Sequence, residues 1–306
     1  MKINKFCLSF FLVMLVVATT AQTKIQITDK NMQLYLSKFN NLLSDNFFDK
    51  GSWLGISMPD GKMGIDKPLI LSEDDATQLD NPLLILSCKV NRQIFSPQIT
   101  NSSLPGKLIQ ESKFQNCSVT LQSIFKNHQT ILLSYTIANH SAKTINVALN
   151  WMPAIGYNTA DNNNLIYKLK NTSLRLQFEQ PLSKGENYSL VSNLSIPFNT
   201  TITKYIAIQY RFNQNNEFEK ISFKDAGKSF AENTRRWYRY LIPYKNLSPE
   251  KQLLAAKCIQ TLIGNWKAAA GELKHDGLFP SYGTFKGFWS WDSWKQAVAL
   301  VTFEPS

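Results

Sequence analysis

The sequence predicts an antiparallel β-sandwich followed by a mainly helical part. Two observations carry this prediction. Apolar residues recur with a period of two from about residue 53 to residue 212, and with a period near 3.6 from about residue 224 onward. The strand-like runs follow one another without helical segments between them, which favours a sandwich over an α/β fold. At 306 residues the chain exceeds what one ordinary core holds, so two domains are expected.

The amino terminus has the features of a cleavable export signal. Lys2 and Lys5 precede an apolar run at residues 6–18, and small residues follow up to Ala21. The run of about 13 residues is shorter than the roughly 20 that a membrane-spanning helix needs. We therefore predict a signal peptide at residues 1–21, a periplasmic or secreted protein, and no membrane association after cleavage.

The predicted β-sandwich domain covers residues 22–223. Its strands are short runs rich in Val, Ile, Thr and aromatic residues, separated by clusters of Asn, Gly, Pro and Ser that favour turns. The expected strands lie at residues 82–91, 118–125, 130–138, 144–151, 165–170, 173–178, 188–194 and 203–212. Trp53 lies between two glycines and is expected to anchor the core of this domain.

A helical linker is predicted at residues 224–248. Within it, residues 226–241 are rich in helix formers and aromatic residues. Trp237, Tyr238 and Tyr240 occur at helical spacing, and such aromatic residues more often pack between domains than bind a ligand. The linker is therefore expected to hold the two parts together.

The last predicted domain, residues 249–306, begins with a second helix. Ser248 suits the cap of this helix and Pro249 its first turn. A third helix is expected to begin near Asp292. Between the two helices, residues 276–287 form a long irregular loop, and long ordered loops are usually functional.

Composition excludes several classes of protein. The chain is 43% apolar and 18% charged, which is typical of a globular protein and not of a disordered one. Its net charge is +11, but Lys and Arg are scattered rather than clustered. This pattern indicates a solvated basic surface, and we predict no nucleic-acid partner. Nothing in the sequence specifies an oligomeric state.

Cysteines and histidines show no metal-binding pattern. Cys88, Cys117 and Cys258 follow the predicted signal peptide without the short spacing of a zinc or redox motif. Cys88 and Cys117 lie in strand-like runs, so a bridge between neighbouring strands is open, although buried free thiols are favoured. The sequence also lacks a glycine-rich phosphate loop, and we predict neither a metal nor a cofactor.

A tryptophan-rich segment at residues 276–295 carries the clearest chemistry. Its tryptophans and the charged residues among them are Trp289, Trp291, Asp292, Trp294 and Lys295. Aromatic faces stack on the apolar faces of sugar rings, while a carboxylate and an ammonium bind hydroxyl pairs. We predict a sugar-binding role for Trp289 and Asp292. Trp294, one turn into the helix, is expected to fill the core.

The motif at residues 288–295, preceded by residues 277–281, resembles the entrance motif of glycoside hydrolase family sixty-three. That family includes the processing α-glucosidase I enzymes and bacterial α-glucosidases. Residues 46–55 also resemble a segment of the β-domain in the bacterial members. The resemblance implies a β-sandwich joined through linker helices to an (α/α)6 barrel, and inverting hydrolysis of α-glucosidic bonds in oligosaccharides.

In that family both catalytic carboxylates lie downstream of the motif. The resemblance therefore implies no catalytic residue in this chain and only the first helices of an incomplete barrel. We expect no turnover from residues 22–306 alone. Asp292 matches the aspartate of the family's sugar subsite, and the substrate-binding residues implied by the motif are Asp292, Trp289, Trp291, Lys295 and Phe279.

A second hypothesis belongs to a different class of protein. The chain would then be a non-catalytic carbohydrate-binding or surface-assembly β-sandwich with a helical tail. Further helical repeats carrying an Asp and a Glu beyond codon 306 would favour the glycosidase hypothesis.

Overall fold

The computed structural model describes most of the chain. The described residues are 28–40, 46–71, 76–94, 98–114, 116–154, 158–161, 163–169, 172–184, 189–212, 218–285 and 287–304. The predicted signal peptide at residues 1–21 lies outside these ranges. Within them, no helix is both long enough and apolar enough to cross a membrane.

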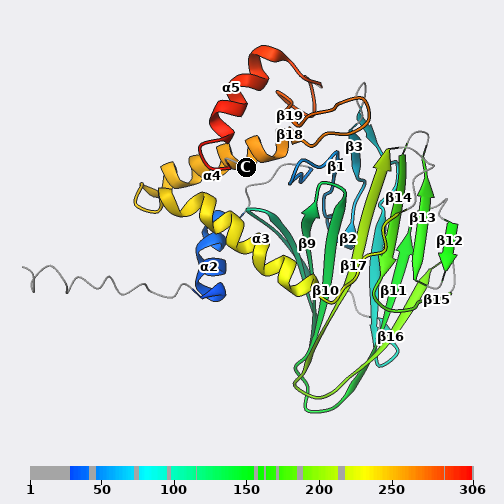
Figure 1. Cartoon of the computed structure of the whole chain (residues 1–306). Coiled ribbons are helices and arrows are strands. Elements are labelled where there is room, and N and C mark those ends of the chain that lie inside the picture. The colour runs from blue at the N-terminus through cyan, green and yellow to red at the C-terminus, as the bar shows by residue number, and fades with distance from the viewer. Residues whose placement is uncertain are drawn as a thin grey trace, which may run out of the picture.

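Two antiparallel sheets make up most of the molecule (Figure 1). In spatial order, the eight-stranded sheet consists of β12 (Asn158–Asp161), β13 (Asn164–Lys168), β14 (Thr172–Phe178), β17 (Thr201–Phe212), β10 (Thr130–Asn139), β9 (Cys117–Asn127), β8 (Lys107–Phe114) and β7 (Gln98–Leu104). The six-stranded sheet consists of β15 (Ser183–Lys184), β16 (Leu190–Ile196), β11 (Ile145–Pro153), β5 (Leu84–Val90) and β2 (Met63–Ile65), with β6 (Gln93–Ile94) paired to β5. These strands confirm the predicted antiparallel β architecture.

Two smaller sheets accompany them. One consists of β1 (Leu54–Gly55), β3 (Leu69–Leu71) and β4 (Ala76–Gln78), and the other of β18 (Trp266–Lys267) and β19 (Gly277–Leu278). The second small sheet lies within the predicted helical part, and its strand β19 belongs to the tryptophan-rich segment.

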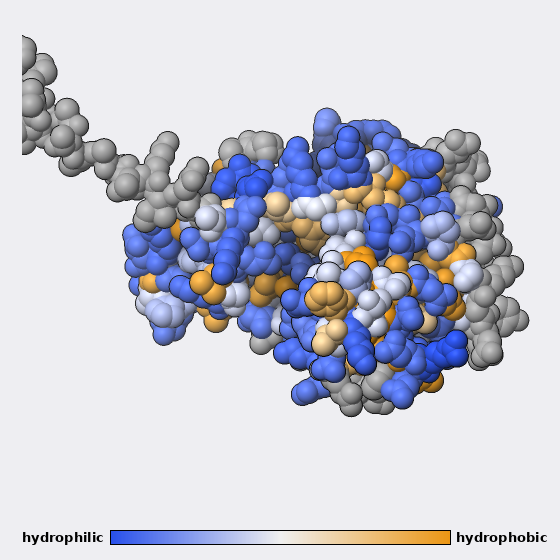
Figure 2. Space-filling view, turned by 90° about the horizontal axis from the view of Figure 1, so that it is seen from below, coloured by the Kyte–Doolittle hydropathy of each residue, from blue (hydrophilic) through white to orange (hydrophobic). Residues whose placement is uncertain are grey.

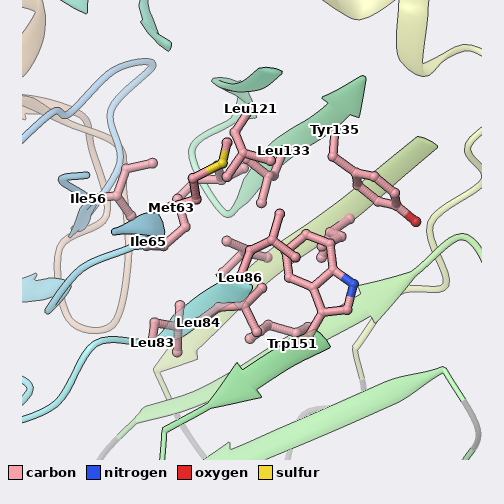
Figure 3. Packing of buried hydrophobic residues seen from close by; sticks show 14 of the residues in the cluster. Ile56, Met63, Ile65, Leu83, Leu84, Leu86, Leu121, Leu133, Tyr135 and Trp151 are labelled. Atoms are coloured by element: carbon pink, nitrogen blue, oxygen red, sulfur yellow. The ribbon is translucent and has the colours of Figure 1, made fainter. Parts of the chain in front are cut away.

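The two large sheets share one core. Trp151 of β11 is fully buried and packs edge-on against Tyr135 of β10, with the ring centroids 5.2 Å apart (Figure 3). This contact joins the six-stranded sheet to the eight-stranded one, as a sandwich requires. Trp53 is 1% exposed, and its Nε1 donates to the Ala268 carbonyl at 2.8 Å. The prediction that Trp53 anchors the core is confirmed.

Helix α3 (Ala226–Leu241) lies across the outer face of the eight-stranded sheet (Figure 1). Its bounds agree with the predicted range of 226–241. Ala226 packs with Ile124 of β9 and Leu132 of β10, whose neighbours in sequence face the sandwich core. Alternation along each strand therefore gives the sheet two buried faces, one in the sandwich and one beneath α3.

Helices α2 (Asp29–Leu36), α3 and α4 (Pro249–Asn265) share a second core. Trp237 of α3 is fully buried there, and its Nε1 donates to Asp49 Oδ2 at 3.1 Å. Tyr240 is 4% exposed. Both residues therefore pack between elements, as predicted. The helix α2 was not predicted, and it lies within the range assigned to the β domain.

Helix α4 begins as predicted, with Ser248 at its N-cap and Pro249 in its first turn, although the Ser248 hydroxyl makes no capping hydrogen bond. Helix α5 (Ser290–Leu300) begins slightly before Asp292, with Trp289 at its N-cap. Short 3₁₀ turns follow α2 and α3 at Ser37–Phe39 and Ile242–Tyr244. The described residues contain a few helices of the predicted helical part and no complete barrel.

The three cysteines of the described residues, Cys88, Cys117 and Cys258, are free thiols. Burial raises the pKa of Cys88 to about 12 and the pKa of Cys117 to about 11, so both are protonated at neutral pH. Cys258 is exposed. The favoured prediction of buried free thiols is confirmed for Cys88 and Cys117, and no bridge joins their strands.

Candidate functional site

Hydrogen bonds fix the tryptophan-rich segment to the end of α4. The strand β19 pairs with β18, which follows α4 directly. The Phe279 N–H donates to the Asn265 carbonyl at 2.9 Å, and Asn265 Nδ2 donates to the Pro280 carbonyl at 3.1 Å. From α5, Ser293 Oγ donates to the Leu278 carbonyl at 2.5 Å. The start of α5 therefore has a defined position on the molecule.

Phe279 belongs to the hydrophobic core. Its side chain is 1% exposed and packs edge-on against Trp53 and Phe288, with ring centroids 5.5 and 4.9 Å away. The sequence placed Phe279 among residues that contact a sugar, but the structure gives it no surface for such a contact. Its observed role is to support Phe288 at the base of the segment.

The three tryptophans of the segment are exposed. Trp289, Trp291 and Trp294 are 53%, 66% and 54% exposed, and Trp291 and Trp294 pack edge-on with centroids 6.3 Å apart. Large aromatic side chains gathered on a surface indicate an interaction site. The prediction that Trp294 fills the core is wrong, because α5 turns this residue outward.

Asp292 and Lys295 are both exposed at the start of α5. Within the described residues, Asp292 makes no ion pair, and its position in the first turn favours a negative charge. Lys295 Nζ lies 4.0 Å from the centroid of the Trp291 ring, which is a cation–π contact. Lys295 therefore covers one face of Trp291, while the carboxylate of Asp292 faces solvent.

A cavity of about 270 Å³ adjoins the beginning of the segment. It lies between α4, the chain around Phe47 and residues 280–282. The lining residues are Asn46, Phe47, Phe48, Lys257, Gln260, Thr261, Gly264, Asn265, Pro280, Ser281 and Tyr282. Trp289 and Asp292 do not line this cavity. The structure thus separates a hollow beside residues 280–282 from the exposed group on α5.

Gln260 is a polar residue of this cavity that sequence reasoning missed. It is 8% exposed, and its Oε1 has no hydrogen-bond partner among the described residues. The sequence contains a pattern that could have identified Gln260. This residue shares an apolar helix stripe with Ala256 and Ile263, at spacings of four and three. A polar side chain in such a stripe indicates a polar hollow beneath the helix.

Lys267 is a fully buried lysine that contacts Phe48 and Gly264, two residues of the cavity lining. Its Nζ donates to the Gly264 and Trp266 carbonyls at 2.6 and 3.1 Å and lies 4.4 Å from the centroid of the Phe48 ring. Burial lowers the pKa of Lys267 to about 7. The carbonyls and the ring provide partners for its charge, so Lys267 is explained by packing.

The lowered pKa of Lys267 predicts a pH dependence of stability. Between about pH 7 and pH 10 the unfolded chain binds more protons at this residue, so the free energy of unfolding rises with pH. From pH 7 to pH 9 the contribution of Lys267 is about 2 kcal/mol. Urea unfolding of the wild type and Lys267→Met at both pH values measures it. Equal slopes in the two proteins would contradict the assignment.

The described residues contain no group of three or more His, Cys, Asp or Glu side chains that could hold a metal ion. The arrangement at α5 offers an aromatic face, a carboxylate and an ammonium to a hydroxylated ligand.

No protein-family model matches the chain. Among solved structures, it is similar to a protein described as a kojibiose phosphorylase from the human microbiome, with 9% identity, a TM-score of 0.48, and coverage of 79% of this chain and 41% of that one. A family GH92 glycosyl hydrolase has 9% identity, a TM-score of 0.39, and coverage of 90% and 47%. An aldose 1-epimerase from Escherichia coli K12 has 9% identity, a TM-score of 0.36, and coverage of 55% and 99%.

These structural neighbours are carbohydrate-active enzymes by name, at low sequence identity. The chain spans less than half the length of the phosphorylase and of the GH92 enzyme. None of the three is named as a member of glycoside hydrolase family sixty-three.

Proposed function

We propose that this chain is the sugar-binding, amino-terminal part of an exported glycoside hydrolase of the inverting α-glucosidase type. Its substrates would be oligosaccharides with α-glucosidic bonds. The observation that carries the proposal is the exposed group at the start of α5, where Trp289, Asp292 and Lys295 present complementary chemistry to a sugar. Export is proposed from the amino-terminal signal.

Each side chain of the group has a distinct part in the proposal. Trp289 is the stacking platform, because one face of Trp291 is covered by Lys295. Asp292 accepts hydrogen bonds from a pair of sugar hydroxyls, and a charged acceptor gives stronger bonds than a neutral one. Lys295, held over Trp291, donates to a neighbouring hydroxyl. Phe279 supports the segment from the core and is left out of the contact set.

In this proposal the chain consists of the three predicted domains. Residues 22–223 form the β-sandwich domain, residues 224–248 the helical linker, and residues 249–306 the beginning of the (α/α)6 barrel. We assign no catalytic acid or base within these residues, so the chain contributes binding to the reaction. Inverting hydrolysis needs two carboxylates with a water between them, and these belong to the rest of the proposed barrel.

Substitutions in the exposed group should weaken sugar binding. Trp289→Ala and Asp292→Asn are each expected to lower the affinity for maltotriose about tenfold, which corresponds to about 1.4 kcal/mol. The matched control is Trp294→Ala, since Trp294 is equally exposed but lies outside the proposed contact set. Isothermal titration of the full chain measures all three.

Two results would speak against this proposal. Equal affinity in the wild type, Trp289→Ala and Asp292→Asn would place any sugar site away from α5, as expected for a non-catalytic carbohydrate-binding sandwich. Equal weakening by Trp294→Ala would indicate a general effect on the helix. Cellotriose, which is β-linked, serves as the comparison for linkage, and tighter binding of cellotriose would exclude the α-glucosidase type.

A further inference from the structure

A second cavity, of about 320 Å³, lies between the helices α2 and α3 and the outer face of the eight-stranded sheet. Figure 2 views the molecule from below and shows a hollow between the helical part and the sandwich, with both hydrophilic and hydrophobic residues on its walls. We call it the α3–sheet cavity. Its volume is at the lower end of the range of about 300–1,000 Å³ for small-molecule sites, which suits one sugar ring.

The wall of this cavity contains a buried lysine without a counter-charge. Lys107 of β8 is 5% exposed, and within the described residues its Nζ makes no ion pair and no hydrogen bond. Asp29 also lines the cavity, but its two oxygens accept from Arg235 at 3.2 and 3.1 Å. Lys107 differs in this respect from the other buried lysine, Lys267, whose Nζ donates to two carbonyl groups.

The side chain of Lys107 is largely removed from solvent, and an ammonium placed in this way costs folding free energy unless something compensates its charge. Burial lowers the pKa of Lys107 to about 8, so the side chain is still mainly charged at neutral pH. The fold keeps this charge at the wall of a cavity, where a bound anion would supply the missing partner.

The sheet places neutral polar groups and an aromatic ring beside the lysine. Ser134 of β10 is directly opposite Gln122 of β9 on one side and Tyr205 of β17 on the other. Residues opposite each other in antiparallel strands point to the same face, so the three form a row across the sheet. In the described part of the chain, the side chains of Gln122 and Ser134 make no hydrogen bonds.

Register also brings Lys107 to this face. Ile109 of β8 is opposite Gln122, and Lys107 precedes Ile109 by two residues, so Lys107 and Gln122 share one side of the sheet. Above the row, the rings of Tyr205 and Phe230 of α3 lie 6.1 Å apart and give the cavity an aromatic wall. One cation, an amide, a hydroxyl and aromatic rings therefore meet at one cavity.

We propose that the α3–sheet cavity binds a hexuronic acid, a sugar ring that carries a carboxylate. The carboxylate pairs with Lys107 Nζ, the ring hydroxyls bond with Gln122 and Ser134, and an apolar face of the ring packs on Tyr205 and Phe230. This site is separate from the exposed group at α5. The proposal does not depend on sugar binding at α5.

The test is calorimetric titration of the full chain with glucuronate, with glucose and acetate as matched ligands. Glucuronate is expected to bind at least tenfold more tightly than either, because glucose lacks the charge and acetate lacks the ring. Lys107→Met is expected to lower the affinity for glucuronate at least tenfold. Ser134→Ala is expected to lower it about threefold.

Lys107→Met is expected to fold, because it removes a charge that has no partner to leave behind. Thermal unfolding of the variant without ligand checks this point. Lys267→Met is the control for loss of a buried lysine elsewhere, and Trp289→Ala is the control for the α5 group. Both controls should bind glucuronate as the wild type does.

The proposal would be overturned by an absence of glucuronate binding up to about 10 mM. It would also be overturned by equal affinities for glucuronate and acetate, or for glucuronate and glucose. Binding that survives in Lys107→Met, or that is lost in Trp289→Ala, would equally contradict the assigned site.

Discussion

Asp49→Asn is expected to destabilise the protein by about 3–5 kcal/mol, because it leaves a buried arginine without its counter-charge. Asp49 is fully buried, and its Oδ2 accepts from both Arg236 and Trp237 Nε1. Asp49 Oδ1 also accepts from the Lys50 N–H at 2.7 Å. The carboxylate therefore connects α3 to the chain that leads into the sandwich.

The residue that precedes Arg236 in α3 provides a matched control. Arg235 bonds with Asp29, but both side chains of that pair are about half exposed. Exposed pairs contribute at most about 1 kcal/mol, so Asp29→Asn should change the free energy of unfolding by no more than that. Urea unfolding measures both variants. Similar losses in the two would show that the buried pair does not hold the helical part to the sandwich.

Gly106→Ala is expected to cost about 2–5 kcal/mol through backbone strain and overlap together. Gly106 has φ +72°, a conformation that favours glycine, and an added Cβ would lie 1.9 Å from Trp237 Nε1. The substitution must therefore displace the indole that donates to Asp49. It also disturbs the Gly106 carbonyl, which accepts from Asn233 Nδ2 at 2.8 Å.

Gly61→Ala separates the cost of backbone strain from the cost of overlap with a neighbouring side chain. Gly61 has φ +64°, but an added Cβ would meet nothing within 4 Å. Only backbone strain remains there, at about 1 kcal/mol. The midpoint of urea unfolding should therefore fall much further for Gly106→Ala than for Gly61→Ala. Equal shifts would mean that the contact between Gly106 and Trp237 is not tight.

Sequence periodicity predicted the strands that face the sandwich core, because their apolar residues alternate. The strands β9 and β10 are examples, and both lie within a few residues of their predicted ranges. The strand β7 was missed because it is a polar edge strand, with only Ser103 and Leu104 buried. The strand β8 was missed because its buried positions include Gln110 and Ser112. Such positions are decided by tertiary partners that periodicity does not contain.

The sugar-binding role predicted for Trp289 and Asp292 stays a prediction, and both residues are exposed. Two other positions differ from the prediction, because Phe279 proved to be core and Trp294 proved to be exposed. A sequence does not state which face of α5 meets α4, and that packing decides both positions. The environment of Lys107 depends on register across three strands and on a helix that follows much later in the chain. No local sequence pattern could therefore indicate that Lys107 lines a cavity.

The central claim is that an α-linked oligosaccharide contacts the tryptophans at the start of α5. The chain has seven tryptophans, so incorporation of 5-fluorotryptophan gives seven fluorine signals that single Trp→Phe variants assign. Titration with maltotriose is predicted to shift the signals of Trp289 and Trp291 while those of the buried Trp53, Trp151 and Trp237 stay in place. Shifts confined to other tryptophans, or none at saturating maltotriose, would contradict the proposed sugar site.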